Sequence, residues 1–289
     1  MAQESFSSPG LCSDAYGADT APDTTGIPLS DIFSDPDVLE ASLTIHRDLP
    51  RQGPGSDATT RALFALAGPL PPSPRVLDLG CGPGRAALLL AEEAGAEVTA
   101  VDLYEPFLIQ LRQEAERRGL ADRIHAAPLD FASLPYPAGS FDLVWAEGSV
   151  YNLGFATGLR IWRRLLAPGG TLMVSECEWL VPEPSAPARA YWDALYPLSS
   201  PAANIDTAVH AGYTVIASRT QPDSDWFEEY YTPLLERMAG LDPDLPGMRA
   251  AMDLQHREID LRRSYGTEYG YTGYVLRPQA ESAKPAGPR

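Results

Sequence analysis

The chain has 289 residues, 44% of them hydrophobic, and a formal net charge of −17 from 22 basic and 39 acidic residues. This length and composition suit one α/β domain with additions, and the acidic balance disfavours nucleic acid as a partner. No apolar run approaches the length of a membrane span, and residues 1–16 lack a basic start and an apolar stretch. We therefore expect a cytoplasmic protein that does not enter a membrane.

The first 70 residues divide into a polar tail and a helical segment. Residues 1–30 are rich in Ser, Gly, Ala, Pro, Asp and Thr, and cannot bury enough surface to order themselves. We expect disorder there, or a lid over a pocket. Residues 31–70 predict a helical cap, interrupted by Arg51-Gln-Gly-Pro-Gly-Ser56. His46 lies in this cap and is the histidine that we consider as a general base.

A glycine-rich turn follows the first expected strand. The segment Arg75-Val-Leu-Asp-Leu-Gly-Cys-Gly-Pro-Gly84 reads as a short buried strand and a turn, and residues 85–94 have helix composition. Glycines at such a turn let the backbone touch a ligand. The spacing is G-x-G-x-G, whereas a dinucleotide fingerprint needs G-x-G-x-x-G. The turn therefore indicates a nucleotide site of another kind.

The next two expected strands also end in acids. Val98-Thr-Ala-Val-Asp102 places Asp102 18 residues beyond Gly84, where such folds hold a carboxylate for two ribose hydroxyls. A helix at 105–118 and a third strand lead to Leu129-Asp130-Phe131. A fourth strand, Ser140-Phe-Asp-Leu-Val-Trp-Ala146, and a fifth, Thr171-Leu-Met-Val-Ser175, complete the alternation. The turn L-x-P-G-G precedes the fifth strand.

These motifs, between residues 75 and 178, resemble those of the class I S-adenosylmethionine (SAM) dependent methyltransferases. The resemblance implies an α/β, Rossmann-like doubly wound sheet of seven strands with the last one antiparallel. It also implies an N-terminal helical cap and helical insertions after strands five and six. On this basis we expect one methyltransferase domain at 71–277, with insertions at about 180–212 and 222–264. Residues 278–289 are expected to be a disordered tail.

The resemblance further implies S-adenosyl-L-methionine as the cofactor. In that family the acid after strand two accepts ribose hydroxyls, the acid after strand three contacts the adenine amine, and the next residue packs on the ring. The residues expected to bind the cofactor are Asp78, Gly80, Cys81, Gly82, Gly84, Asp102, Leu103, Asp130, Phe131, Glu147, Arg51 and Gly53. No His, Cys or acid spacing suggests a metal site.

The acceptor should lie beyond strands four and five and beneath the inserted helices. Further short motifs within residues 51–233, such as E-G-x-x-Y-N-x-G-F and W-x-x-x-Y-Y-x-P, resemble a bacterial subgroup that methylates small molecules. The catalytic candidates are Glu147, His46, Glu176 and Tyr151. For the two acids the alternative is a salt bridge to an arginine such as Arg51, Arg160 or Arg163. The candidates for acceptor contact, with core packing as the alternative, are Trp145, Tyr151, Asn152, Trp179, Trp192, Tyr196, Trp226, Tyr230 and Tyr231.

The expected function is in-line transfer of a methyl group from SAM to a small-molecule acceptor. Aromatic residues and acids in cap positions favour an aromatic or nitrogen-bearing secondary metabolite, of indole or amine type, with N-, C- and O-methylation all open. A SAM-binding protein with a non-methylating or regulatory role is an alternative. An NAD-dependent oxidoreductase is another, against which the glycine spacing and the L-x-P-G-G turn argue. Capping helices of this fold can pair subunits, so a homodimer is compatible with it.

Overall fold

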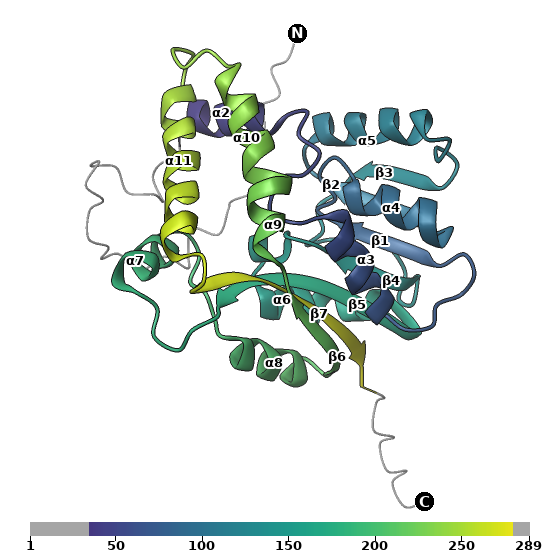
Figure 1. The fold of residues 1–289 in the computed structure, drawn as a ribbon. Coiled ribbons are helices and arrows are strands. Elements are labelled where there is room, and N and C mark those ends of the chain that lie inside the picture. Colours follow the sequence, from purple (N-terminus) through teal and green to yellow (C-terminus); the bar gives the residue numbers. More distant parts are fainter. Residues whose placement is uncertain (1–34, 280–289) are drawn as a thin grey trace, which may run out of the picture.

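A seven-stranded sheet, ordered β3-β2-β1-β4-β5-β7-β6, forms the centre of the computed structural model, which describes residues 35–279 (Figure 1). The strands are β1 (Arg75–Leu79), β2 (Glu97–Asp102), β3 (Ile124–Pro128), β4 (Phe141–Ala146), β5 (Leu166–Trp179), β6 (Tyr213–Thr220) and β7 (Tyr269–Pro278). The first five strands are parallel, and β7 runs antiparallel to both β5 and β6. The fold class predicted from the sequence is confirmed.

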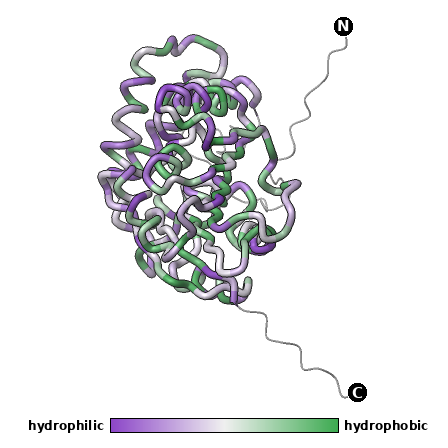
Figure 2. Tube along the Cα trace, turned by 90° about the vertical axis from the view of Figure 1, so that its right-hand side faces the viewer, coloured by the Kyte–Doolittle hydropathy of each residue, from purple (hydrophilic) through white to green (hydrophobic). Residues whose placement is uncertain are grey.

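Helices cover both faces of the sheet. One face carries α3 (Asp57–Leu66), α4 (Arg85–Ala94) and α5 (Glu105–Arg117), and the other carries α6 (Phe155–Trp162) and α8 (Pro201–His210). Successive strand residues point to opposite faces, so Val76 joins the first core and Leu77 the second. Burial on both faces explains the nearly continuous apolar runs of the parallel strands. Figure 2 shows hydrophobic segments through the interior and hydrophilic turns on the outer helices.

A third core lies among helices that stand beyond one end of the sheet, and we call this unit the cap. It comprises α2 (Pro36–His46), α7 (Ala186–Leu195), α9 (Asp223–Trp226), α10 (Thr232–Ala239) and α11 (Met248–Tyr265). Figure 1 shows α2, α10 and α11 grouped on one side of the sheet. β5 is 14 residues long, and its last residues, including Cys177 and Trp179, pack into the cap core. The sheet thus continues into the cap through β5 and its partner β7.

The cap segment between β6 and α11 is not one regular helix. α9 passes into a five-residue π-helix, Phe227–Tyr231, before α10 begins. Pro233 in the first turn of α10 has no N–H to donate to the residue four positions earlier, so a wider turn precedes it. The last cap helix, α11, begins at Met248, after Gly247 with a φ of 69°.

The expected tails fall mostly outside the described residues. Residues 1–34 and 280–289 are not described, and β7 extends one residue into the segment expected as the C-terminal tail, ending at Pro278. Within residues 35–279, no helix is long and apolar enough to cross a membrane. In that same part of the chain, no three His, Cys, Asp or Glu side chains are grouped closely enough to hold a metal ion.

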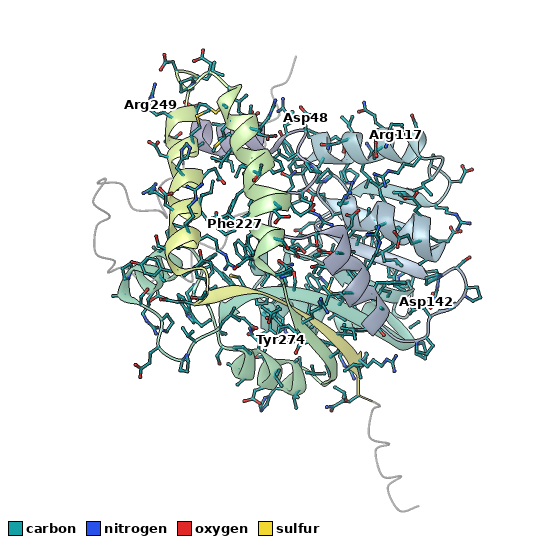
Figure 3. All side chains as sticks on the ribbon, viewed as in Figure 1. Asp48, Arg117, Asp142, Phe227, Arg249 and Tyr274 are labelled. Carbon is teal, nitrogen blue, oxygen red and sulfur yellow. The ribbon has the colours of Figure 1, made fainter. Side chains whose placement is uncertain are left out.

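Buried polar bonds connect the sheet to α8. Glu178 on β5 is 0% exposed, and its Oε2 accepts hydrogen bonds from the Tyr274 hydroxyl and, at 2.8 Å, from Asn204 Nδ2. Figure 3 marks Tyr274 on β7. A buried carboxyl group without donors is costly, so these bonds hold β5, β7 and α8 together.

We expect Tyr274→Phe to lower the free energy of unfolding by about 1.5–3 kcal/mol, because a buried carboxyl group loses a donor. The matched control is Tyr213→Phe, whose buried hydroxyl donates to the backbone oxygen of Leu159 at 2.9 Å. Losing this neutral bond should cost about 1 kcal/mol. Urea unfolding measures both variants. Equal losses of unfolding free energy in the two variants would contradict the larger contribution expected for the hydrogen bond to the Glu178 carboxyl group.

Candidate active site

The turn after β1 requires glycine at three positions. Gly80, Gly82 and Gly84 have φ values of 66°, 53° and 81°, in the left-handed region that L side chains rarely adopt. A Cβ on Gly84 would lie 2.2 Å from Leu111 Cδ1, and one on Gly80 would lie 2.6 Å from the Cβ of Ser149. The turn therefore brings bare backbone to the carboxyl end of β1, beside its neighbour β4. In doubly wound folds ligands bind at such a switch point in strand order.

Asp102, at the end of β2, fixes the backbone beside this turn, at the edge of the sheet formed by the carboxyl ends of the parallel strands. Its Oδ2 accepts a hydrogen bond from the backbone N–H of Gly82, and its Oδ1 accepts one from that of Tyr104, both at 2.9 Å. Each carboxylate oxygen keeps a further acceptor position, so the group can also accept ribose hydroxyls. Leu103 next to it is 58% exposed and offers an apolar surface at the same edge. This combination fits an adenosine group.

Phe131 reaches the same turn from the end of β3. Its Cε1 lies 3.4 Å from the position of a Cβ on Gly80, and its ring packs edge-on against Trp162 with centroids 6.0 Å apart. The preceding Asp130 accepts a hydrogen bond from the Ala132 N–H at 2.8 Å. Phe131 therefore lies beside the glycine turn, and the adenine contacts of both residues stay a prediction. Within the turn, burial raises the pKa of the Cys81 thiol, which suits packing better than nucleophilic chemistry.

Asp78 is the buried acid beneath the turn. It is 2% exposed, and among the described residues its Oδ2 has no hydrogen-bond partner. Burial first, and then the charges of Glu147 and Asp102, raise its pKa to about 8. A buried polar atom without a partner requires an explanation. A donor group on a bound ligand, such as the ammonium of an amino acid, supplies one.

Glu147, directly after β4, is held by groups from three segments. Its carboxylate accepts hydrogen bonds from Thr60 Oγ1 at 2.9 Å and from Trp145 Nε1 at 3.1 Å, and lies 3.4 Å from Arg51 Nη1. The side chains of Glu147 and Arg51 are only 8% and 9% exposed. Arg51 also pairs with Asp57 at 3.1 Å. The salt bridge considered as the alternative to catalysis is therefore present. Glu147 joins the loop before α3 to the sheet.

Trp145 and Gly53 each lie two residues along the chain from one member of the Arg51–Glu147 ion pair, and their surroundings differ. Trp145 is fully buried on the same sheet face as Leu143, beneath α3 and α4. This placement differs from the expected contact with the acceptor, because the alternation along β4 turns the indole into the core. Gly53, expected near the cofactor, has no atom within 4 Å of the position of a Cβ.

His46 forms a hydrogen-bonded pair with Tyr230. Its Nδ1 lies 2.8 Å from the carbonyl oxygen of Ser42, which can only accept, so Nδ1 carries the proton. In the neutral ring, Nε2 then accepts the hydroxyl of Tyr230 at 2.9 Å. Burial lowers the pKa of His46, so the ring is neutral near pH 7. The Tyr230 oxygen keeps acceptor capacity, and the pair can receive a proton from a group beside that tyrosine.

Glu176 faces α6 and α8. It is 4% exposed, Tyr196 donates its hydroxyl to Oε1 at 2.5 Å, and Oε2 has no partner among the described residues. Burial and then the charge of Glu178 raise the pKa of Glu176 to about 8. Glu176 and Tyr196 line a cavity of about 230 Å³ with Asn204. Another cavity, of about 410 Å³, opens at the amino ends of β1 to β4, and none of the predicted site residues lines it.

The remaining candidates separate into accessible and buried residues. Tyr151 is 46% exposed, Asn152 is also exposed, and the Tyr151 ring lies edge-on to Tyr196 with centroids 6.2 Å apart. The others pack in or against the cap core, where four of them are at most 7% exposed and Trp192 is half-buried. These are Trp179, Trp192, Trp226, Tyr230 and Tyr231. The rings of these residues therefore pack in the core, which was the alternative to acceptor contact. The hydroxyls of Tyr230 and Tyr231 still form hydrogen bonds, with His46 and Glu258 respectively.

Sequence reasoning missed Glu258 on α11. Its Oε1 accepts the hydroxyl of Tyr231 at 2.8 Å, and burial raises its pKa. A signal was present, because the spacing of Ala251, Leu254, Glu258 and Arg262 follows the buried face of one helix. Tyr191 and Tyr271, half-buried near the same acid, were likewise not in the predicted set.

The order of the strands, the glycine turn at the β1–β4 switch, and the acids Asp78 on β1, Asp102 at the end of β2 and Asp130 after β3 are those of the class I methyltransferase fold. In agreement, residues 76–170 match a family described as methyltransferase domain. Residues 76–170 thus match a methyltransferase domain, and the sheet that contains them has the fold of the class I SAM-dependent methyltransferases.

One similar protein is the 27-O-demethylrifamycin SV methyltransferase of Amycolatopsis mediterranei (strain S699). It is 36% identical over 132 residues, which is 45% of this chain and 48% of that protein. The chain thus spans about half the length of this curated relative.

Solved structures share the fold at low sequence identity. A SAM-dependent methyltransferase from Geobacter sulfurreducens, in complex with S-adenosyl-L-homocysteine, has a TM-score of 0.73 at 20% identity, covering 83% of this chain and 98% of that one. The [4+2]-cyclase SpnF has a TM-score of 0.68 at 20% identity, covering 91% of this chain and 100% of that one.

The glycine turn gives the first test of this site. We expect Gly84→Ala to lower the melting temperature and to weaken SAM binding about tenfold or more, because the new Cβ meets Leu111 and the φ of 81° is strained. Gly119→Ala is the matched control, with a φ of 71° and no atom within 4 Å of its Cβ position. It should lower the melting temperature and leave SAM binding unchanged. Thermal unfolding and titration calorimetry measure both effects.

Proposed function

We propose that this protein is an enzyme that transfers a methyl group from SAM to a small-molecule acceptor. The observation that carries the proposal is the site at the carboxyl ends of β1 and β2, formed by the left-handed glycine turn, Asp102 and an Asp78 oxygen that has no hydrogen-bond partner within residues 35–279. When bound, SAM supplies an electrophilic methyl group on a sulfonium. The net charge of −17 supports a small molecule over nucleic acid as the acceptor.

The strand ends have distinct roles in this proposal. Asp102 would accept the ribose hydroxyls, Asp130 the adenine amine, and Phe131 would pack on the ring. Asp78 and the backbone of the turn would hold the amino-acid end of the cofactor. Glu147 and Arg51 act as positioning residues, because their contacts with Thr60, Trp145 and Asp57 fix the loop above this edge.

The acceptor side follows from the residues beyond β4 and from the cap. Tyr151 and Asn152 are exposed next to the cofactor edge, so they can contact an acceptor aligned with the methyl group. Tyr230 and His46 can take up a proton released by that acceptor. The exposed ring of Tyr151, edge-on to Tyr196, supports an aromatic or nitrogen-bearing secondary metabolite as the acceptor. The similarity to a methyltransferase acting on a rifamycin compound supports natural-product chemistry.

A second candidate is a SAM-binding protein that does not transfer methyl groups. The fold does not by itself dictate the reaction, and a solved structure described as a [4+2]-cyclase shares it. Labelled methyl from SAM separates the two functions, because only the first moves the label into the acceptor.

Binding and transfer are tested with Asp102→Asn. The amide nitrogen cannot accept a backbone N–H as the carboxylate does, so we expect SAM affinity to fall about tenfold or more. The exposed acid Asp122 provides the control variant Asp122→Asn. Titration calorimetry measures binding, and transfer of labelled methyl to a panel of metabolites measures activity. Unchanged SAM binding in Asp102→Asn, or no SAM binding by the unmodified protein, would overturn the proposal.

The histidine–tyrosine pair gives a pH prediction. Burial lowers the pKa of His46 below its ordinary value of 6.5, so the neutral, proton-accepting ring is lost only as the pH falls below that value. We expect kcat to rise through an acidic limb and to level off by about pH 6.5. His46→Gln and Tyr230→Phe should both remove this limb and lower kcat about 100-fold. His256→Gln, an exposed histidine on α11, should change neither.

A further inference from the structure

Gln52 lies in the loop between α2 and α3 and packs on the glycine turn. A Cβ on Gly82 would lie 3.1 Å from Gln52 Cγ, so this side chain contacts the bare backbone of the turn. Figure 1 shows the loop passing from the cap to the sheet. Gln52 is half-buried and was not in the predicted set, although its neighbours Arg51 and Gly53 were. A ligand that binds against the turn therefore meets Gln52.

The amide of Gln52 has a partner at one end only. Its Nε2 donates to the carbonyl oxygen of His46 at 3.1 Å. A carbonyl oxygen can only accept, so this bond assigns the nitrogen and the oxygen of the amide. The other atom, Oε1, is buried and has no hydrogen-bond partner among residues 35–279. A buried acceptor without a donor is costly and requires an explanation.

A second acceptor without a partner belongs to the same turn. It is Oδ2 of Asp78, two residues before Gly80, and it is also buried. The two oxygens come from separate segments, the loop before α3 and the strand β1. Each of them needs a donor, and an ammonium group carries three donors and no acceptor. An ammonium group bound at the turn therefore has the donors that both oxygens lack.

The backbone on both sides of Gln52 is held in place. Arg51 lies 3.4 Å from the Glu147 carboxylate, and the N–H of Gly55 donates to the carbonyl oxygen of Asp225 at 3.2 Å. One contact fixes the loop to the sheet and the other fixes it to α9 of the cap. A side chain on a loop held in this way can bind a ligand at a small cost in ordering.

We propose that Gln52 is a cofactor-binding residue whose amide oxygen accepts a hydrogen bond from the ammonium group of SAM, an inference that rests on the proposed methyltransferase function. The donors of SAM are its ribose hydroxyls, its adenine amine and its ammonium group. The first two are assigned to Asp102 and Asp130, so the ammonium group is the donor left for Asp78 and Gln52. The bond from Nε2 then connects the amino-acid end of the cofactor to the last residue of α2, His46.

The proposal is tested with S-adenosylhomocysteine and its deamino analogue, in which a hydrogen atom replaces the amine. Titration calorimetry at pH 7 measures the affinity for each ligand. A hydrogen bond from a charged donor contributes about tenfold or more, so two acceptors should give the unmodified protein a preference of about 100-fold for S-adenosylhomocysteine. Equal affinity for the two ligands would overturn the proposal, whatever the behaviour of any variant.

Gln52→Met removes the amide and keeps the length of the side chain. This variant should reduce the preference about tenfold and bind the deamino analogue as the unmodified protein does. If it weakens both ligands equally, Gln52 only supports the loop and the proposal is overturned. Gln52→Glu keeps an acceptor oxygen and loses the donor to His46, so it should keep the preference. Its loss there would assign the effect to the bond with His46 and overturn the proposal.

Gln110→Met is the matched control. Gln110 on α5 donates from its side-chain amide to the carbonyl oxygen of Leu49 at 3.3 Å, so this change also removes one bond to the segment that carries Gln52. The preference for S-adenosylhomocysteine should stay unchanged. A reduction as large as that of Gln52→Met would mean that the loop as a whole causes the effect, against the proposal.

Failure of the proposed function gives a different result. In that case the unmodified protein binds neither SAM nor S-adenosylhomocysteine, or moves no labelled methyl to any compound. Failure of the inference on Gln52 leaves cofactor binding and methyl transfer intact, and the discrimination between the amine and its deamino analogue is then independent of this residue.

Discussion

The ion pair between Arg51 and Glu147 is the contact on which the arrangement of this site depends. It joins a loop outside the sheet to the end of a central strand, and both side chains are almost completely buried. Such a pair adds little net stability, but removing one partner leaves an uncompensated buried charge at a cost of about 3–5 kcal/mol. Burial raises the pKa of Asp78 most, and the Glu147 charge adds to that rise. One contact thus fixes the loop and tunes the acid beneath the glycine turn.

Much of the sheet could be predicted from the sequence because its signals are local. The glycine spacing, the acids at strand ends and the L-x-P-G-G turn each depend on a few consecutive residues. The directions of side chains around the strand ends were harder to predict. Whether Trp145 faces the core and whether Glu176 faces α6 depend on the alternation and pairing of long strands. Those features are set by tertiary contacts.

The cap was predicted as helices that carry candidate site residues, but the contacts between those residues were not predicted. Its acid, Glu258, meets Tyr231 across 27 residues of chain, and His46 meets Tyr230 across 184. A helical pattern reports which face of a helix is buried but not which distant helix covers it. The interruption at Phe227–Tyr231 adds to the difficulty, because a π-turn rotates the residues that follow it relative to an ideal helix. The partners of these polar groups therefore emerge only from the folded chain.

The cap is composite, and this bears on how its specificity can change. It draws on the segment before β1, the segment between β5 and β6, and the segment between β6 and β7. The second and third of these are held at both ends by strands, so neither can swing about a single hinge. Each can instead accept substitutions while the strands keep the glycine turn and Asp102 in place. Descendants of this chain could thus exchange one acceptor for another, one segment at a time, without rebuilding the cofactor edge.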